Sequence, residues 1–532
     1  MKFQSNERSQ KNTRRVAARR QVLRFGKDTG GGIAIIAALL LLPIMLFIGI
    51  AVDLSMAYGK RTHIQDAADT ASLAVVKEIG TLDDDALLAL AKKIMTANLP
   101  AGQGYTITAF NVTRDPAKIE ITAQIDHPTS FLQLAHIDTI DVGVFSEAVI
   151  DSSTLEIALV LDNSGSMSGA RIDSLKEAAN DFVNRLFLGA STSSNIKIGI
   201  VPFTSMVNVG PNNKGARWLD MKAENPLHDE GFPKGTNRWD LYDMLKNASW
   251  TGCVEARKHP YDVNDVAPYS VKNKDPFAAG VDADALWVPT FAPDEPDSTR
   301  YYQNSYVSDS KFIPWWMRRD DDDGIDSELS KYLNSYVSFF DAGGTTSGPG
   351  FLCDAQPLTP LTNVKSTLTA SISKMRAYGG TNMHQGVAWG WRVLSPSEPF
   401  TEGVSYETDD NAKILVLMSD GANHHNGMPV DEMSMYSPYN YTKYGRLGAP
   451  SSNTQVIINQ MNARTKSVCT NAKNAGIKVI TIAFNIEDKK ALQLLEHCAS
   501  SKEMAYTVET TSQLEAKFEE IAKDLQKMRI AY

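Results

Sequence analysis

The feature that most constrains this chain is an uncharged run of 24 residues from Thr29 to Val52, TGGGIAIIAALLLLPIMLFIGIAV. A helix of this length crosses a bilayer, and a membrane helix tolerates a proline such as Pro43. Residues 1–27 contain nine Lys or Arg and one acid, so the positive-inside rule predicts a cytoplasmic tail over residues 1–28. A cleaved signal peptide is the alternative, but its apolar core usually spans about 7–15 residues. We therefore predict an uncleaved, single-pass transmembrane helix at residues 29–52, with the bulk of the chain outside the cytoplasm.

Charge is distributed unevenly along the 532 residues. The formal net charge is −9 and the basic tail contributes +8, which leaves −17 for everything after residue 27. An acidic body argues against nucleic acid as a partner, because the phosphate backbone would repel it. The basic tail, in contrast, suits contact with anionic lipid headgroups.

A second constraint is the stretch EIALVLDNSGS, from Glu156 to Ser166. Its apolar run, Ile157 to Leu161, predicts a buried strand, and Asp162, Ser164 and Ser166 follow that strand. Ligands of open α/β sheets bind beyond the carboxyl ends of the strands. One carboxylate and two hydroxyls offer only oxygen, the donor that a hard divalent cation such as Mg2+ prefers.

Two distant stretches complete the pattern. The sequence GGTN presents a hydroxyl at Thr381, and a second apolar strand, Ile414 to Met418, is followed by a carboxylate at Asp420. The order D-x-S-x-S, then Thr, then Asp resembles the metal-ion-dependent adhesion site of von Willebrand factor A domains. The resemblance implies a site for Mg2+ (or Mn2+ or Ca2+) made by Asp162, Ser164, Ser166, Thr381 and Asp420. In that family, an acidic side chain of a protein partner fills one remaining position on the metal. The alternative is that these are turn and N-cap residues of an ordinary α/β fold.

The A-type domain is expected over residues 151–532, interrupted by an insertion subdomain at residues 206–361. The insertion far exceeds ordinary loop lengths and is rich in aromatic residues. Most of its tryptophans are expected to form its core, with a carbohydrate- or protein-binding face as the alternative. Its acidic run at residues 320–323 is interpreted as a solvated turn. Further strands are expected at Ile196–Phe203, Lys478–Phe484 and Ala505–Val508.

After the apolar run, the chain carries an aspartate and then an Ala-rich Q-x-A-A-D-x-A segment. The residues concerned are Asp53, Gln65, Ala67, Ala68, Asp69 and Ala71. This arrangement resembles the N-terminal region of TadG-like proteins of Flp (Tad) pilus assembly, as does the string GGTNMHQGVAWGWRVLSPSEPF in the second half. We expect residues 53–150 to form a TadE/TadG-like, pilin-like region, a small α+β domain with one helix and several strands after the Ala-rich helix.

Four cysteines are present: Cys253, Cys353, Cys469 and Cys498. Their spacing does not match a zinc site. An even number of cysteines beyond a membrane segment favours two disulfides, since that compartment is oxidising. Grouping along the chain favours pairing the first two and the last two, although four cysteines allow three connectivities. Four buried thiols are the alternative.

Three histidines lie near the expected metal site in the sequence. His384 is expected to pack internally or lie on the surface, because Mg2+ prefers oxygen ligands. His424 and His425 follow Asp420 on a long loop, where they line the rim of the metal face or belong to a plain surface loop.

The sequence contains no nucleophile–base set, Walker loop or dinucleotide fingerprint, so we do not expect an enzyme. The expected fold class is α/β, with a single N-terminal transmembrane helix, a small α+β membrane-proximal domain and a doubly wound, Rossmann-like von Willebrand factor A domain with a large insertion. The leading hypothesis is a bacterial inner-membrane protein with its bulk in the periplasm, which binds protein partners of pilus assembly or of the envelope through its metal site. The alternatives are a surface-exposed adhesin that binds matrix or host proteins, and an accessory partner of an ATPase or chaperone system.

Overall fold

The computed structural model describes residues 31–100, 102–114, 117–149, 154–268, 282–297, 302–308, 329–340 and 346–530. The basic tail at residues 1–28, the acidic run at 320–323, and Trp315 and Trp316 lie outside these residues. The chain divides into two compact units, one within residues 1–148 and the other formed mainly by residues 149–532.

The first unit is built on one continuous helix, α2 (Gly31–Val75), which contains Pro43. By length and composition, the segment from Leu39 onward can cross a membrane, and large apolar side chains such as Phe47 (72% exposed) point outward. Beyond Asp53 one face of the helix is buried. The fully buried residues of that face are Ile64, Ala67, Ala68, Ala71 and Val75. One helix thus changes from apolar on all sides to amphipathic, as the spacing of its Ala-rich segment predicts.

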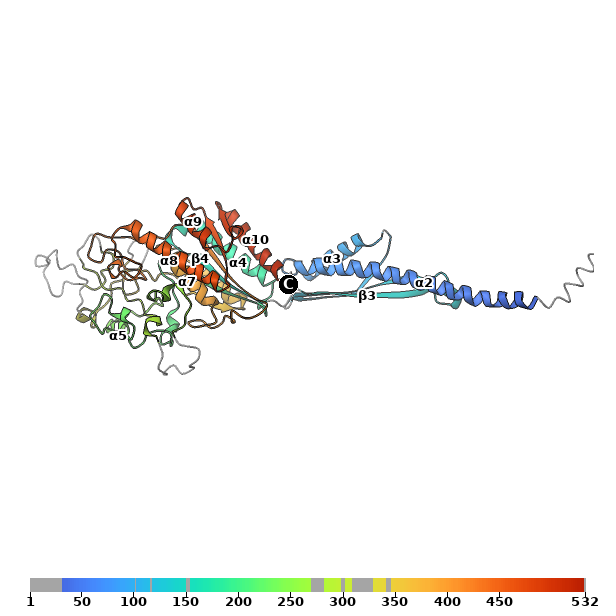
Figure 1. Cartoon of the computed structure of the whole chain (residues 1–532), viewed down its shortest axis with the longest axis horizontal. Coiled ribbons are helices and arrows are strands. Elements are labelled where there is room, and N and C mark those ends of the chain that lie inside the picture. The colour runs from blue at the N-terminus through green and yellow to red at the C-terminus, as the bar shows by residue number, and fades with distance from the viewer. Residues whose placement is uncertain are drawn as a thin grey trace, which may run out of the picture. The chain divides into compact units, whose positions relative to one another are not determined.

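The remainder of this unit is a helix and a small sheet (Figure 1). A short 3-10 turn, η1 (Val76–Glu78), is followed by α3 (Asp84–Asn98), which packs against α2. Three strands follow in the order β1 (Thr106–Arg114), β2 (Ala117–Pro128) and β3 (Thr139–Val149), with η2 (Leu132–Ala135) between β2 and β3. Alternate residues of β2, from Ala117 to Ile125, are buried, which is the pattern of a sheet with one covered face.

The second unit contains a six-stranded sheet. Its strands are β4 (Thr154–Asp162), β5 (Ile196–Phe203), β6 (Thr359–Thr362), β7 (Asn411–Ser419), β8 (Lys478–Phe484) and β9 (Ala505–Val508). They lie in the order β6-β5-β4-β7-β8-β9. Only β6 is antiparallel to its neighbour. Counted along the chain, this is the doubly wound order 3-2-1-4-5-6, so the prediction of a doubly wound α/β fold is confirmed.

Helices cover both faces of this sheet (Figure 1). One layer holds α4 (Ala170–Leu186), α6 (Lys365–Ser373) and α10 (Thr511–Ile530), and the other holds α7 (Met383–Leu394), α8 (Thr454–Asn474) and α9 (Lys489–Cys498). Side chains of β4 alternate between the two layers: Ile157 and Leu159 join the first core, Ala158 and Val160 the second. Burial on both faces explains why this strand is a continuous apolar run in the sequence.

The insertion lies between β5 and β6. In its described part the regular elements are short: α5 (Arg238–Met244) and the 3-10 turns η4 (Pro211–Asn213), η5 (Pro226–Asp229), η6 (Tyr261–Val263), η7 (Ala283–Ala285) and η10 (Leu329–Tyr332). Trp218, Trp239, Trp250 and Trp287 are buried. The ring centroid of Trp287 lies 5.6 Å from that of Trp389 on α7. The insertion therefore shares its main core with the α7 layer of the sheet, and a smaller buried cluster around Cys253 and Cys353 joins it to the loop that follows β7.

Two disulfides are present. Cys253 is joined to Cys353 within the insertion, and Cys469 on α8 is joined to Cys498 at the end of α9. Both pairs are those that grouping along the chain favoured.

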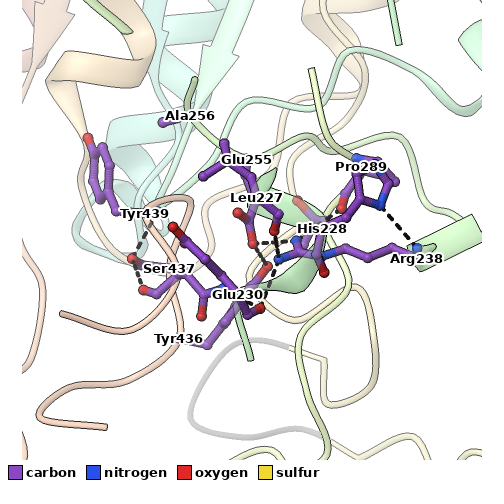
Figure 2. A network of polar contacts seen from close by, with 12 residues as sticks. Leu227, His228, Glu230, Arg238, Glu255, Ala256, Pro289, Tyr436, Ser437 and Tyr439 are labelled. Atoms are coloured by element: carbon purple, nitrogen blue, oxygen red, sulfur yellow. Dashed lines mark hydrogen bonds and ion pairs between the residues drawn. The ribbon is translucent and has the colours of Figure 1, made fainter. Parts of the chain in front are cut away.

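A buried polar network ties the insertion to the loop that follows β7. We name it the insertion cluster; it consists of Glu230, Arg238, Glu255, Tyr436 and Arg446. Figure 2 shows most of its members. Arg238 Nη1 and the Tyr436 hydroxyl each donate to Glu255 Oε1 at 2.6 Å, and Arg446 pairs with the other Glu255 oxygen. Because every one of these charges has an opposite partner, the network can be buried.

Candidate functional site

The candidate site lies where the direction of the sheet reverses. β4 and β7 are neighbours, with Leu161 aligned to Met418, and the strands that follow each of them along the chain are placed on opposite sides of this pair. Such a switch point leaves a crevice at the carboxyl ends of the two strands. The alignment therefore brings Asp162, at the end of β4, beside Ser419 and Asp420.

Asp162 organises the first loop. Its Oδ1 accepts the Ser164 N–H at 2.8 Å, and its Oδ2 accepts the Ser419 hydroxyl at 2.6 Å. The carboxylate thus links the loop after β4 to the end of β7. The Asp162 side chain is fully buried, so each of these hydrogen bonds compensates part of the cost of removing it from water.

The two serines connect this loop to the second carboxylate. The hydroxyls of Ser164 and Ser166 lie 3.0 Å apart, and the Ser166 hydroxyl donates to Asp420 Oδ1 at 2.6 Å. Arg171, in the first turn of α4, donates from Nη1 to Asp420 Oδ2 at 2.8 Å. The Asp420 side chain is buried, whereas that of Arg171 is 36% exposed. Both oxygens of Asp420 are therefore engaged, one of them by a partly solvated cation.

Thr381 lies on a third loop that is bonded to the first. The Gly165 N–H donates to the Gly379 carbonyl oxygen at 2.9 Å, and the Thr381 carbonyl oxygen accepts the His424 N–H at 2.9 Å. Gly379 has φ +65°, a conformation that favours glycine. Thr381 is 5% exposed. The Gly-Gly-Thr segment thus places its threonine between the loops that follow β4 and β7.

Helix α7 holds this third loop close to the sheet. Asn382 caps the helix by accepting the Gln385 N–H at 3.3 Å. Two glycines of α7 face β4: an added Cβ on Gly390 would lie 2.4 Å from Val160 Cγ2, and one on Gly386 would lie 3.0 Å from Val160 Cγ1. Side chains at these positions would push the helix outward and displace Thr381 from the other loops.

The electrostatics of the site favour an added positive charge. Burial raises the pKa of Asp162 above its ordinary value, and the negative charge of Asp420 raises it further. Among the residues that the structure describes, Arg171 is the one ion-pair partner of these two carboxylates. A divalent cation between the two loops would balance the carboxylates and stabilise both as anions.

The donor set fits an oxygen-preferring metal. The side chains brought together offer two carboxylates and the hydroxyls of two serines, with a threonine hydroxyl on the adjoining loop. Among the residues that the structure describes, no group of three or more His, Cys, Asp or Glu side chains is placed to hold a metal. Ion binding here would therefore depend on the hydroxyls, and hard ions of the Mg2+ type suit such ligands better than softer metals.

The nearby histidines do not join this donor set. His384 is fully buried, with Nδ1 2.6 Å from the Tyr439 hydroxyl and Nε2 3.1 Å from the Asp262 carbonyl oxygen. Burial lowers the pKa of His384 to about 4, and that of His425 also to about 4. His425 is 7% exposed and is therefore an interior residue rather than a rim or surface residue. His424 is exposed, and its N–H holds Thr381.

Three contributors to the site were not foreseen from the sequence. Ser419 immediately precedes the predicted Asp420, and its position at a strand end was the available signal. Nothing in the sequence indicated that Arg171 contacts the site, apart from its position at the start of a predicted helix. Ser205, where the insertion begins, accepts the Gly380 N–H on its hydroxyl at 3.0 Å and the Asn382 side-chain amide on its carbonyl oxygen at 3.1 Å. The insertion thus supports the Thr381 loop directly.

Strand order and loop position give the second unit the doubly wound α/β arrangement expected of a von Willebrand factor A-type domain, with the D-x-S-x-S loop at the switch point. Residues 31–78 match the family model described as putative Flp pilus-assembly TadE/G-like. The N-terminal segment is therefore similar to this family over the matched residues. No curated protein matches the sequence.

Among solved structures, the chain is similar to the von Willebrand factor domain of a type V pilus tip protein from Porphyromonas gingivalis, with 10% identity, TM-score 0.33, and coverage of 71% of this chain and 97% of that one. An adhesive tip pilin from Group B Streptococcus agalactiae gives 9% identity, TM-score 0.33, and coverage of 70% and 100%. Proximal thread matrix protein 1 from the mussel byssus, solved with a zinc-occupied MIDAS motif, gives 11% identity, TM-score 0.28, and coverage of 71% and 47%.

Proposed function

We propose that this chain is a non-enzymatic, membrane-anchored protein of pilus assembly or pilus anchoring, which binds a protein partner through a divalent cation at the β4–β7 switch point. The observation that carries the proposal is the hydrogen-bonded convergence of Asp162, Ser164, Ser166 and Asp420 at one edge of the sheet. The match of residues 31–78 to the Flp pilus-assembly family supports the pilus context.

Each residue has a role in this proposal. The hydroxyls of Ser164, Ser166 and Thr381 would coordinate the cation, and Asp162 and Asp420 would bind it directly or through water. The bound cation would supply an exchangeable position for an acidic side chain of the partner. Because Asp420 is engaged by Arg171 in the present arrangement, this guanidinium would have to release at least one carboxylate oxygen.

The proposed location is the bacterial inner membrane, with the N-terminus in the cytoplasm and the bulk of the chain in the periplasm. The support is the apolar part of α2 and the basic residues that precede it. Alkaline phosphatase fused after Tyr58 should be active, because that enzyme requires an oxidising compartment to form its disulfides. An inactive fusion, with an active cytoplasmic reporter at the same position, would invert the proposed topology.

The metal-bridged contact is tested by cross-linked capture from cells. The intact protein is compared with Asp162→Ala and Thr381→Ala, each with and without a chelator. Thr381→Ala is the gentler variant, because the Thr381 hydroxyl makes no hydrogen bond within the part of the chain that the structure describes. Asp240→Ala removes an exposed carboxylate of the same domain and serves as the control. Pilus or envelope proteins should be captured by the intact protein and by the control, and lost in both site variants and in chelator.

Capture that persists in both site variants and in chelator would show that the metal site is not the docking contact. Two further outcomes separate the alternative functions. Labelling of the A-type domain on intact cells by a membrane-impermeant reagent would favour a surface adhesin. Capture of an ATPase or chaperone in place of pilus proteins would favour the accessory role.

A further inference from the structure

The turn between β2 and β3 exposes large apolar side chains. We name residues 130–137, sequence SFLQLAHI, the β2–β3 tip. Leu134 is 76% exposed, Ile137 45% and Phe131 42%, whereas Leu132 points inward. A turn on a soluble surface is ordinarily built from Gly, Pro, Asn, Asp and Ser, so an apolar tip of this kind requires a reason.

The β2–β3 tip is fastened to α2 at a defined level. The Asp53 carboxylate, itself 1% exposed, accepts the backbone N–H groups of Ser130, Phe131 and Leu132 at 3.1, 2.8 and 2.8 Å. The ring of Phe131 packs on Gly49, where an added Cβ would lie 2.5 Å from the Phe131 Cγ. Three hydrogen bonds and a close aromatic contact thus hold the tip against one turn of the helix.

That turn is the end of the uncharged run. Gly49 lies within the run, and Asp53 is the first charged residue after it. Close to Gly49 along α2, Met45, Phe47 and Ile48 are 64%, 72% and 59% exposed, as expected of side chains that face lipid. The exposed apolar side chains of the tip therefore continue an apolar surface that already belongs to the anchor helix.

After Asp53 along the chain, the side chains of the helix are those typical of a membrane interface. Tyr58 is 65% exposed, and Lys60 and Arg61 are the first basic residues after the uncharged run. Tyrosine is enriched at the boundary between hydrocarbon and headgroups, and basic side chains suit anionic headgroups. At a rise of about 1.5 Å per residue, Tyr58 lies roughly 8 Å beyond Asp53 along the helix axis. The tip is therefore level with the start of the hydrocarbon.

The backbone of the tip is suited to leave water. Besides the three N–H groups held by Asp53, Leu134 donates to the Phe131 carbonyl at 3.0 Å, His136 to Gln133 at 3.0 Å and Ile137 to Leu132 at 3.1 Å. Backbone groups that lack a partner are the main obstacle to placing a loop in a bilayer. Here most N–H groups of the tip are already bonded.

We propose that the β2–β3 tip is a second membrane contact, in which Phe131, Leu134 and Ile137 enter the leaflet that α2 crosses last. The proposal rests on α2 being the membrane anchor. We choose lipid over a protein partner because the tip continues the lipid-facing side of α2 at the same depth. With two contacts in one leaflet, the membrane would fix the depth and the rotation of α2. The orientation of the β1–β2–β3 sheet relative to the membrane would then be fixed as well.

The test uses the full chain in liposomes, with a nitroxide attached to a cysteine introduced at Leu134. The four native cysteines are held in disulfides, so the oxidised protein is labelled only at the new position. Collisions of the nitroxide with oxygen, which concentrates in lipid, are compared with collisions with a water-soluble nickel chelate. Two further labels calibrate the reading. Leu41→Cys reports on the anchor, and Gln124→Cys reports an exposed position of β2, roughly 17 Å along the strand from Thr129.

We expect the label at position 134 to behave like that at 41, with several-fold higher oxygen than nickel accessibility, and the label at 124 to show the reverse. A label at 134 as accessible to nickel as that at 124 would overturn the proposal while leaving the anchor intact. Protection of position 134 from both reagents would indicate a protein partner and would also overturn it. If position 41 is itself accessible to nickel, the anchor proposal fails instead.

Discussion

Two buried charge clusters in the second unit differ in how their carboxylates are balanced by positive charge. The insertion cluster places two guanidinium groups, Arg238 and Arg446, against two carboxylates, Glu230 and Glu255. The switch-point site places two carboxylates, Asp162 and Asp420, against one guanidinium, Arg171, which is partly exposed. The first cluster is balanced by its own residues, and the second carries an excess of one negative charge.

This difference in charge balance indicates that the insertion cluster has a structural role, whereas the switch-point site can accept a cation. A buried ion cluster that is already neutral gains nothing from an added ion, and it holds together the segments that contribute to it. A site with surplus negative charge, whose hydroxyl oxygens can still coordinate an ion, is stabilised by an added cation. The four predictions below test this contrast, beginning with the largest expected effect.

Glu255→Gln should destabilise the second unit strongly. It removes the negative charge that Arg238 and Arg446 share, and loss of one partner of a buried pair costs about 3–5 kcal/mol. Denaturant unfolding followed by tryptophan fluorescence measures this, because all eight tryptophans lie beyond residue 149. The exposed Glu224→Gln should change stability by less than about 0.5 kcal/mol. If Mg2+ restored the stability that Glu255→Gln loses, the insertion cluster would bind a cation, which would contradict the prediction that its charges are balanced by its own residues.

Mg2+ should stabilise the second unit through the switch-point site. At a concentration 100 times the dissociation constant, a ligand specific for the folded state adds about 2.7 kcal/mol. Melting temperatures with Mg2+ and with a chelator should therefore differ for the intact protein and for Asp240→Ala, and coincide for Asp162→Ala. An equal shift in all three proteins would place the ion elsewhere.

Acid should weaken the insertion through His228. Burial and the charge of Arg238 lower the pKa of His228 to about 3, and its Nδ1 accepts the Arg238 backbone N–H at 3.1 Å. The folded state then binds fewer protons than the unfolded state between its ordinary pKa of 6.5 and about 3. The stability due to neutral His228 is present above pH 6.5 and lost as the pH falls, by about 1.4 kcal/mol per pH unit.

Urea unfolding at pH 7, 6 and 5 checks the effect of His228. His228→Asn keeps an acceptor but does not titrate, so its stability should fall less steeply than that of the intact protein. The exposed His136→Asn is the control. Parallel pH dependences of the intact protein and His228→Asn would show that other groups govern acid lability.

Arg171→Gln should produce the smallest effect of the four, and it should strengthen Mg2+ binding rather than weaken it. If Arg171 competes with the cation for Asp420, its removal tightens Mg2+ binding by about fivefold, which corresponds to about 1 kcal/mol, the scale of a partly exposed ion pair. Calorimetric titration with Mg2+ measures the affinity. Arg185, at the far end of α4, pairs with Glu519 on α10. Arg185→Gln breaks that ion pair away from the site and should leave the Mg2+ affinity unchanged. Weaker binding by Arg171→Gln would make this arginine a support of the site rather than a competitor.

The central strands and their loops could be predicted because their signals are local. β4 and β7 are buried on both faces and therefore appear as apolar runs, and the oxygen-bearing residues stand directly after them. β6 was missed: it has four residues, contains Pro360 and pairs only at the sheet edge, where proline is tolerated. Nothing in such a segment distinguishes it from a loop.

The remaining features depend on partners that are distant in the sequence. Asp53 was recognised only as part of a motif, because the N–H groups that it accepts lie 77 to 79 residues further along the chain. In the same way, Trp287 packs on Trp389 across about a hundred residues, and no periodicity of the insertion reveals that contact. Composition predicted that the insertion is folded, but not which face of the sheet it joins.

The position of β4 has a mechanical consequence. One end of this strand carries Asp162, and the other end, Thr154, follows the segment that leads back to the first unit. β4 is flanked on both sides by parallel strands, with eight aligned residue pairs on each side. A partner that pulls on a cation at Asp162 would load β4 along its length, so both ladders would have to shear together rather than open one hydrogen bond at a time. If the proposed contact forms at this site, it would therefore resist tension through both hydrogen-bond ladders that flank this strand.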